Sequence, residues 1–445
     1  MPKLCLIGFM FLTIFAALMT GCGGSTQKSA KPQGMMAVSS ASMPGCLSVL
    51  DFEARADGKT DDTAAIQRAI DKAAETGGQV LLPAGRYLVE GSLTVKKGVS
   101  LIGVYDAPQA IAPLTGTVIM ATGGRDNEDA PALFEMGHSS MVRGLTVWYP
   151  EQKPRDIHPY PWTFRLQGFD NTVENITLIN SYNAIRTGPE INVRHRIRSV
   201  YGCALRRGIF VDYCTDIGRI ENVQFHNHWW SDPSIGGEWD PVYEYMAANL
   251  EAFVLGRTDW EYLTNNFVFP AKIGYRFIQI EKGASNGHLT GCGADSTNIA
   301  VQVDAIQPMG LLITGGQFVS FKGDRPTQLV VAPSNTGSVK LVNCSFWGPS
   351  FQNAHIEGTG NVSFNNCYLS NWNKEVGDQP LITALSGRLQ VNDSTFATGQ
   401  VSVELGPDVT HAIIRGNNVA TSDTGVCVLN EHNRPAIIKD NETTP

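Results

Sequence analysis

The chain has 445 residues, of which 34 are Lys or Arg and 42 are Asp or Glu, so its formal net charge is −8. This acidic balance gives no electrostatic reason to bind nucleic acid. A hydrophobic content of 42% excludes both a disordered chain and a polytopic membrane protein. Glycine contributes 45 residues, an excess that is typical of chains with many tight turns.

The N-terminal pattern predicts an exported lipoprotein. Lys3 precedes an apolar run over residues 4–18, which is too short to span a bilayer and is typical of a secretory signal. The stretch Leu-Met-Thr-Gly-Cys that ends at Cys22 resembles a bacterial lipobox. This resemblance implies a signal peptide at 1–21, a lipid on Cys22 and a flexible tether at 22–46. We therefore expect a lipid-anchored protein of the bacterial cell envelope, at the outer membrane or cell surface. The alternative is an ordinary signal peptide with a cysteine nearby.

An amphipathic helix is predicted over residues 62–75, where apolar side chains recur at helical spacing. Thr60 or Asp61 supplies its N-cap, and a Gly-Gly pair ends it. The paired acids Asp61 and Asp62 are therefore interpreted as capping residues rather than catalytic ones. Short apolar strands follow, separated by Gly and Pro turns.

From residue 142 onward a four-residue pattern recurs: an apolar residue, any residue, a small residue or Asn, then an apolar or small residue. Clear copies begin at Val142, Val173, Ile197, Ile220, Leu341 and Phe364. Successive copies lie 23 to 31 residues apart with one exception, and such a period indicates one supersecondary unit repeated along an axis.

The repeated units are rich in β-branched residues, Asn and Gly and lack helical periodicity, so they predict strands. We therefore predict an all-β fold, a right-handed parallel β-helix, as a single domain at 47–445 whose N-terminal end is capped by the helix. Asn at the third position of the repeat suits a turn. Cys292, Cys344 and Cys367 fall in one column, which fits a stack of small side chains inside the coil.

The opening of this domain resembles a known superfamily. The stretch from Val49-Leu-Asp-Phe52 through Asp57-Gly-Lys-Thr-Asp-Asp62 to Tyr87 is similar to the pectate-lyase-like β-helix proteins, in the branch of rhamnogalacturonases, family 28-related glycoside hydrolases and epimerase-like lyase domains. The resemblance implies the fold but no single activity, because hydrolases, lyases, epimerases, tailspikes and adhesins share it. The aspartate motifs of family 28 do not carry over, since the equivalent turns hold Tyr182-Asn183 and Arg206-Arg207.

The one long interval of the repeat, 44 residues between Val223 and Phe267, indicates an insertion at about 227–262. It is rich in Trp, His and acidic residues, and aromatic faces with paired carboxylates suit a glycosidic bond. Candidate catalytic residues, from the insertion and neighbouring turns, are Glu151, Asp156, Arg207, Asp232, Glu238, Asp240, Asp259 and Asp295. Candidate substrate-binding residues are Trp148, Tyr149, His158, Trp162, Tyr182, Asn183, Arg206, His226, His228, Trp229, Trp230, Trp239 and Lys272. The alternative is that the tryptophans only anchor the insertion.

Three functions are compatible with these residues. The favoured one is an envelope-anchored carbohydrate-active enzyme that hydrolyses glycosidic bonds of a polysaccharide with paired carboxylates. The second is a polysaccharide lyase or epimerase acting on a uronate polymer, which needs a base for the C5 proton and a cation for the carboxylate. The third is a non-catalytic glycan-binding surface protein.

The expected partner is a polysaccharide, with membrane contact through the lipid anchor only and no nucleic acid. No P-loop, dinucleotide fingerprint or Cys/His zinc spacing occurs, so we expect no cofactor and no metal site. A Ca²⁺ ion is considered only for the alternative in which the protein is a lyase. The sugar, the linkage, the disulfide pairing and the oligomeric state stay open.

Overall fold

The structure is a computed structural model that describes residues 45–105, 113–373, 379–397, 401–420 and 425–442. The predicted signal peptide, the predicted lipidation site Cys22 and nearly all of the predicted tether lie outside the described residues. Within the described ranges, no helix is both long enough and apolar enough to cross a membrane.

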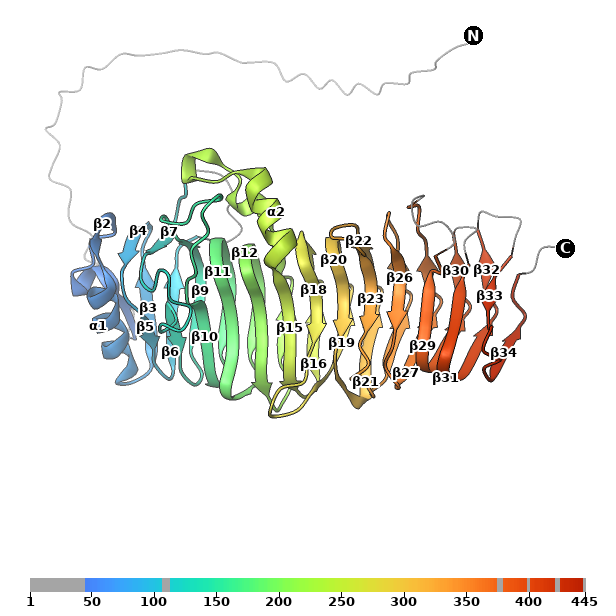
Figure 1. Ribbon diagram of the computed structural model, residues 1–445. Coiled ribbons are helices and arrows are strands. Elements are labelled where there is room, and N and C mark those ends of the chain that lie inside the picture. Colours follow the sequence, from blue (N-terminus) through green and yellow to red (C-terminus); the bar gives the residue numbers. More distant parts are fainter. Residues whose placement is uncertain (1–44, 106–112, 374–378, 398–400, 421–424, 443–445) are drawn as a thin grey trace, which may run out of the picture. The chain divides into compact units, whose positions relative to one another are not determined.

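The described chain from residue 45 onward winds into successive coils whose strands pair in parallel with the coils before and after (Figure 1). The predicted right-handed parallel β-helix is confirmed. Each coil visits three sheets, which we name A, B and C in chain order.

Sheet A contains β1 (Cys46–Ser48), β3 (Gly78–Leu82), β6 (Val99–Gly103), β13 (Arg219–Glu221), β16 (Glu261–Thr264), β19 (Ser285–Thr290), β21 (Ile306–Thr314), β24 (Val339–Val342), β27 (Asn361–Asn365) and β34 (Ala436–Lys439). Sheet B contains β2 (Asp57–Asp61), β4 (Gly85–Val89), β7 (Thr117–Ala121), β14 (Gln224–His226), β17 (Phe267–Phe269), β22 (Gln317–Ser320), β25 (Ser345–Phe346), β28 (Tyr368–Leu369), β30 (Thr395–Phe396) and β32 (Asn418–Val419).

Sheet C contains β5 (Leu93–Val95), β8 (Phe134–Met136), β10 (Trp162–Phe169), β15 (Glu251–Thr258), β18 (Ala271–Phe277), β23 (Thr327–Val331), β26 (Gln352–Ile356) and β33 (Val428–Leu429). Six long strands bend through corners and serve more than one sheet: β9 (Met141–Trp148), β11 (Thr172–Val193), β12 (Arg196–Cys214), β20 (Gly293–Val303), β29 (Ile382–Asn392) and β31 (Val403–Arg415).

Inward side chains stack from coil to coil into one continuous core. On sheet C the paired residues Ile185, Ile209, Phe253 and Tyr275 are fully buried. The Phe253 and Tyr275 rings stack with centroids 4.9 Å apart. Each such aliphatic or aromatic side chain contributes about 1.5–3 kcal/mol by burial. The column of Cys292, Cys344 and Cys367 is also buried, as the sequence predicts, and these cysteines are free.

The recurring Asn forms the corner from sheet A to sheet B in a left-handed backbone conformation. Its φ angle lies between 51° and 55° at Asn175, Asn222, Asn265, Asn343 and Asn366. Asn tolerates this region better than most residues because its short side chain bonds locally. The predicted turn role of the repeat Asn is therefore confirmed.

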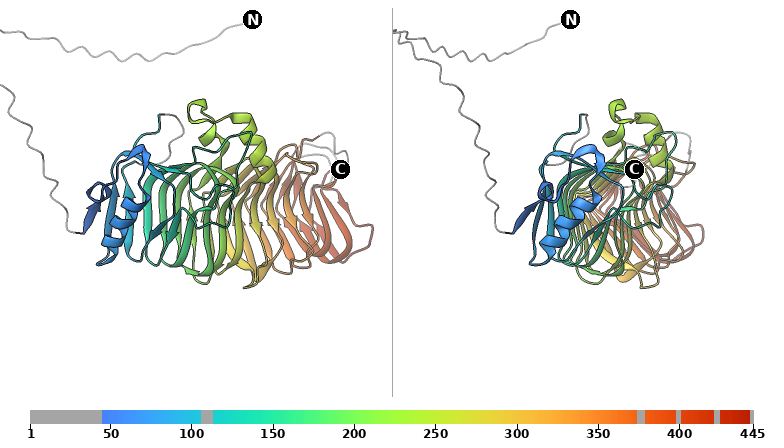
Figure 2. Two further views of the ribbon diagram at one scale, coloured as in Figure 1. Left: turned by 60° about the vertical axis from the view of Figure 1, so that its left-hand side comes forward. Right: turned by 90° about the vertical axis from the view of Figure 1, so that its left-hand side faces the viewer.

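Helix α1 (Thr63–Ala74) lies across the N-terminal end of the stack (Figure 2). Ile66 and Ile70 are fully buried on its inner face. Asp61 Oδ1 accepts hydrogen bonds from the backbone N–H of Thr63 at 3.0 Å and from its hydroxyl at 2.5 Å. The Asp62 carboxylate accepts two backbone N–H groups of the preceding loop, at 2.6 and 3.0 Å. Both acids are therefore structural, and short η1 (Val49–Phe52) packs beside the helix.

The insertion occupies residues 227–250, between β14 of sheet B and β15 of sheet C. It consists of η2 (Asn227–Trp230), η3 (Pro233–Ile235) and α2 (Trp239–Asn249), and it stands out from one corner of the coils (Figures 1 and 2). The predicted C-terminal limit near 262 is too late, because the chain has already resumed its coil in β15 and β16.

Candidate functional site

Three long links share the corner that leads from sheet B to sheet C, which we call the insertion corner. They are residues 122–133, 149–161 and the insertion 227–250. Arg155 pairs with Glu238 at 2.7 Å and so ties the second link to the insertion. Arg125 pairs with Glu151 at 3.3 Å and ties the first link to the second. The structure thus brings the predicted turns and the insertion together at one corner.

Buried aromatic side chains anchor this region. Trp229 is 7% exposed and Trp230 is fully buried, so neither offers a face to a sugar. Tyr149 and Asn183 are also buried, and Asn183 Nδ2 donates to the carbonyl oxygen of Tyr160 at 3.1 Å. The substrate-binding assignments of Trp229, Trp230, Tyr149 and Asn183 are therefore wrong, because the hydrophobic effect places these side chains in the core.

Trp239, His226 and His228 form an exposed aromatic patch at the base of α2. Trp239 is 44% exposed, and its ring centroid lies 5.7 Å from that of His226. The His226 ring stacks on Phe269 at 4.7 Å. Burial, and secondarily the nearby His228, lowers the pKa of His226 to about 4. These aromatic faces, where β14 meets the insertion, are the surface that a sugar ring can reach.

Two predicted catalytic acids form ion pairs with arginines. The Glu238 carboxylate accepts from Arg155 Nε at 3.2 Å and from Nη2 at 2.7 Å. Glu151 accepts from Arg125 Nη1 at 3.3 Å. Each of these carboxylates is engaged by a guanidinium, which would have to be displaced before the group could protonate a glycosidic oxygen in hydrolysis.

The other predicted acids of this region are open to water. The Asp156 side chain is 73% exposed and lies 3.3 Å from His158 Nε2, while His158 Nδ1 also lies 2.8 Å from Asp126. Asp232 caps η3 by accepting the backbone N–H of residue 234 at 2.8 Å, and Asp240 is exposed in the first turn of α2. None of these solvated carboxylates has the enclosed, water-poor surroundings in which glycosidase acids are tuned.

Asp259 lies away from the insertion corner. It follows β15, at the corner that leads from sheet C to sheet A, and its carboxylate accepts from Arg257 at 2.5 and 2.7 Å. Its predicted membership of the insertion site is therefore wrong, since the chain runs the length of sheet C between the two corners.

Asp295 and Lys272 lie on the coils that follow the insertion. Asp295 stands at the insertion corner in β20, and burial raises its pKa. Its neighbour Ser296 lies 2.5 Å from the Tyr243 hydroxyl, which connects this corner to α2. Lys272 is exposed in β18.

A polar cluster lies between the first link, the coil corners and α2. The Tyr182 hydroxyl interacts with the Glu128 carboxylate and with Tyr245 of α2. Glu128 also accepts from Asn183 Nδ2 at 3.3 Å. Burial, with Tyr245 and Glu128 adding to it, raises the pKa of Tyr182, while Arg206 opposes the rise. Burial raises the pKa of Tyr245 as well.

Arg206 is the cation of this cluster. It is half-buried, and among the described residues no carboxylate lies within ion-pair distance of it. Its neighbour Arg207 instead pairs with Glu251 at 3.4 Å, and burial, followed by repulsion from Arg206 and Arg276, lowers the pKa of Arg207. A half-buried guanidinium without a protein anion is suited to an anionic ligand.

Further arginines continue from this cluster along the outer face of sheet C. Arg165 and Arg186 pair across neighbouring strands, and both Arg186 and Arg207 lie over the Phe210 ring, at 5.6 and 5.7 Å. Trp162 stands 6.4 Å from the same ring. This face therefore combines cations with aromatic surface. Trp148, in contrast, is half-buried at the end of β9 in sheet B, where it pairs with Met120.

A cavity of about 310 Å³ opens on this face one coil further on. Arg207, Glu251, Arg276 and Asp304 contribute its charged lining. Arg276 donates to Glu251 at 2.7 Å and to Asp304 at 2.9 Å. In contrast to Arg206, these arginines are already neutralised.

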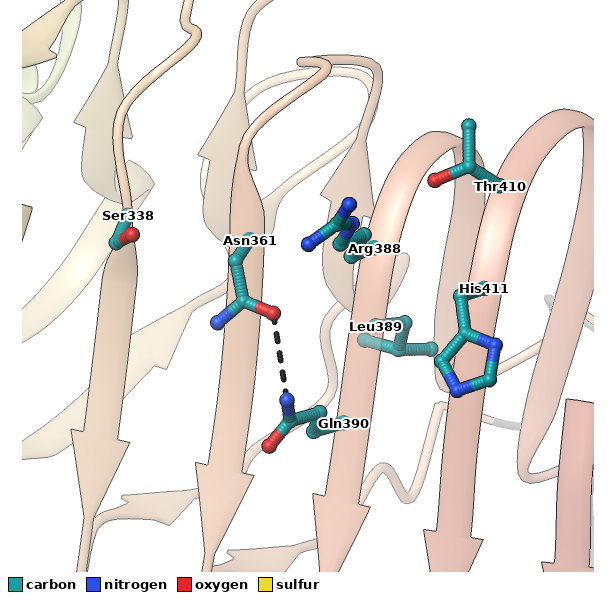
Figure 3. Close-up of a pocket in the computed structure, with 7 residues that line it drawn as sticks. All are labelled: Ser338, Asn361, Arg388, Leu389, Gln390, Thr410 and His411. Carbon is teal, nitrogen blue, oxygen red and sulfur yellow. Dashed lines mark hydrogen bonds between the residues drawn. The ribbon is translucent and has the colours of Figure 1, made fainter. Parts of the chain in front are cut away.

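A second hollow, of about 640 Å³, lies on the outer face of sheet A in the C-terminal coils (Figure 3). Arg388, Thr410 and His411 line it, and Gln390 donates to Asn361 at 3.5 Å. No predicted catalytic residue lies in it, and it faces away from sheet C. The insertion corner is therefore the stronger candidate site.

Glu128, Tyr245, Glu251, Arg165, Arg186 and Arg276 were not predicted from the sequence. Glu128 and Tyr245 belong to two separate links and meet Tyr182 only because the coils stack in register. The register of sheet C, which the repeat pattern partly encodes, is the one signal that points to the arginines.

Comparisons with known proteins agree with the fold. Residues 46–122 match the family described as rhamnogalacturonase A/epimerase, pectate lyase-like. The A-module of the mannuronan C-5 epimerase AlgE4 of Azotobacter vinelandii superposes with a TM-score of 0.56 at 15% identity, over 88% of this chain and 100% of that chain. The chain therefore has the pectate-lyase-like β-helix fold.

Two curated relatives match a short segment. The mannuronan C5-epimerase AlgE3 of Azotobacter vinelandii is 45% identical over 83 residues, and the alginate lyase 7 of the same organism is 42% identical over 88 residues. These segments cover 17% and 18% of this chain but only 4% and 9% of the two relatives.

Proposed function

We propose that the protein is a carbohydrate-active enzyme that removes the C5 proton of a uronate residue in a polysaccharide, as a lyase or an epimerase. The observation that carries this proposal is the half-buried Arg206, which has no described anionic partner and faces Tyr182 and Tyr245 at the insertion corner. A uronate carboxylate supplies the missing anion.

Each residue of the cluster has a role in this reaction. Arg206 neutralises the uronate carboxylate, so that negative charge developing at C5 is stabilised. Glu128 accepts the C5 proton. Tyr182, whose pKa is raised, keeps its proton at neutral pH and donates it.

The two reactions differ only in the final step. In a lyase, the C5 electron pair forms a C4–C5 double bond while the C4–O bond breaks, and the departing oxygen takes the proton of Tyr182. In an epimerase, C5 takes a proton on the opposite face and no bond of the chain breaks. Both outcomes balance without an oxidant or a reductant.

This proposal replaces hydrolysis as the favoured reaction, because Glu238 and Glu151 are held by arginines, whereas Arg206 has no carboxylate within ion-pair distance among the described residues. The two curated relatives, each matched over a short segment, are named as a mannuronan epimerase and an alginate lyase, which supports uronate chemistry. The family match ends at residue 122, before Glu128. The roles proposed for the residues of the polar cluster are therefore supported by the geometry of the cluster and not by the family match.

The test compares Arg206→Ala with a matched control, Arg388→Ala, on the face of sheet A. Purified variants are incubated with uronate polymers, and unsaturated products, C5 configuration and reducing ends are each measured. We expect Arg206→Ala to lose about 10²–10³-fold in rate, and Glu128→Gln and Tyr182→Phe about 10²–10⁴-fold. Arg388→Ala should keep the wild-type rate.

Two outcomes contradict the proposal. Saturated products with new reducing ends would identify a hydrolase, in which case Asp295→Asn becomes the informative variant. Binding of the polymer with no product of any kind would identify a glycan-binding protein.

A further inference from the structure

Two columns of side chains meet inside the corner that leads from sheet C to sheet A. The first column is Asn192, Cys214 and Thr258, which pair across three successive coils. The second column is His195, Gly218 and Glu261, whose C-terminal neighbours pair with one another in the same three coils. Both columns lie at the C-terminal end of the sheet C strands, whereas the insertion corner lies at the N-terminal end of these strands.

Gly218 allows the His195 ring and the Glu261 carboxylate to approach its backbone closely. A Cβ atom at Gly218 would clash with the His195 ring and with both carboxylate oxygens of Glu261. The Cys214 thiol lies beside them, and one donor atom from each of His195, Cys214 and Glu261 lies within 4.8 Å of the others. All three residues are at most 1% exposed. One nitrogen, one sulfur and one oxygen donor are therefore clustered in the core at this corner.

A second set of contacts orients these donors. His195 Nδ1 lies 2.9 Å from Asn192 Oδ1, which fixes the ring. The Thr258 hydroxyl donates to Glu261 Oε2 at 2.7 Å. His195 Nε2 and Glu261 Oε1 share a hydrogen bond at 2.8 Å, which a metal ion bound by both atoms would replace. Metal-binding histidines and carboxylates are held by this kind of outer hydrogen bond.

The donor set selects the ion. Thiolate, imidazole and carboxylate are the ligands of Zn²⁺ in proteins, whereas Ca²⁺ and Mg²⁺ take oxygen donors. We propose that His195, Cys214 and Glu261 bind one zinc ion, which joins three successive coils. Binding releases the thiol proton of Cys214 to solvent. The site is buried and separate from Arg206, so its role is structural. The test of this zinc site is therefore independent of the test of the proposed reaction.

This site could not be predicted from the sequence because its residues are 19 and 47 positions apart, far from the short spacings of zinc motifs. Only the coil register brings them together.

The test measures metal content in the full chain, purified without chelators or an affinity tag and then equilibrated with buffered Zn²⁺. We expect about one zinc per chain, and at least a fivefold lower content in Cys214→Ser and Glu261→Gln. The matched control is Cys292→Ser, a buried cysteine of another column, which should keep its zinc. Circular dichroism checks that each variant is folded.

A second measurement needs no variant that risks misfolding. Co²⁺ replaces zinc in the wild-type protein, and a thiolate-to-cobalt absorption band in the near ultraviolet is expected. Zinc content below about a tenth of an equivalent, with no cobalt–thiolate band, would overturn the proposal. Equal zinc content in wild type and a folded Cys214→Ser would also overturn it, because the ion would then lie elsewhere.

Discussion

At the scale of single residues, the coil depends on side chains that tolerate a left-handed backbone. The corner from sheet A to sheet B places the third residue of the repeat at positive φ, and Asn occupies it five times. Asn366 also donates to Asn343 at 2.8 Å, so these two amides are linked on the outside of the coil. This backbone requirement explains why the repeat can be detected in the amino-acid sequence.

The first prediction concerns Asn343, where φ is 54°. Asn343→Val should lower the free energy of unfolding by about 1–2 kcal/mol, because a β-branched residue is strained in this region. Asn343→Gly should cost less, since glycine adopts it freely. Urea denaturation followed by circular dichroism measures both. Equal losses for the two variants would show that the lost hydrogen bond from Asn366, and not backbone strain, governs the corner.

His226 gives the protein a pH-dependent contribution to stability. Its pKa is about 4 in the folded protein against 6.5 for an ordinary histidine, so the unfolded chain binds more protons between these values. Stability from this group is therefore complete above pH 6.5 and falls as the pH drops towards 4.

We predict that His226→Gln, which keeps a neutral acceptor but does not titrate, loses less stability than wild type on acidification from pH 7 to 5. The measurement is the melting temperature of both proteins across this range. Parallel curves would contradict the assignment of a lowered pKa to His226.

At the scale of elements, the insertion is a small folded unit fastened to the coils. Val242 and Met246 of α2 are fully buried, and the Met246 sulfur lies 3.4 Å from Cys203 Sγ. Trp230 fills the space beneath it. A rigid α2 matters for the proposed site because Tyr245 reaches Tyr182 from this helix.

Trp230→Ala should destabilise the insertion by about 3–5 kcal/mol, the usual cost of deleting a buried aromatic side chain. We expect faster proteolytic cleavage within residues 227–250 while the β-sheet circular dichroism is retained. Trp239→Ala, whose parent side chain is 44% exposed, is the control and should leave the cleavage rate nearly unchanged. If both variants are cleaved at the wild-type rate, Trp230 is not the anchor.

The elements that were predicted correctly are those with a local cause. The period of the repeat follows from coil geometry, and α1 follows from its apolar spacing and from the acids at its start. The C-terminal limit of the insertion was wrong because the repeat is weak across 251–264, where β15 and β16 resume the coil. The predicted sugar-binding role of Trp229 and Trp230 was wrong because both side chains are buried. A Trp-rich sequence does not show whether its rings face solvent or the core.

At the scale of the whole molecule, stacking turns residues that are distant in sequence into columns. Predicted residues such as Tyr182 and Arg206 lie at the insertion corner because their turns are equivalent in successive coils. Their partner Glu128 could not be predicted, since it comes from a link of irregular length that follows no repeat. The arginines of sheet C could be found only with the strand register in hand.

The fate of the hydrogen at C5 tests the central proposal most directly. Uronate polymers are incubated with the protein in D₂O, and the products are analysed by proton NMR. We predict loss of the C5 hydrogen, seen as deuterium at C5 in an epimerised polymer or as a C4–C5 double bond in a cleaved one, and its abolition in Arg206→Ala. Products that retain every C5 proton, or an Arg206→Ala variant as active as wild type, would contradict the assignment of this corner to uronate chemistry.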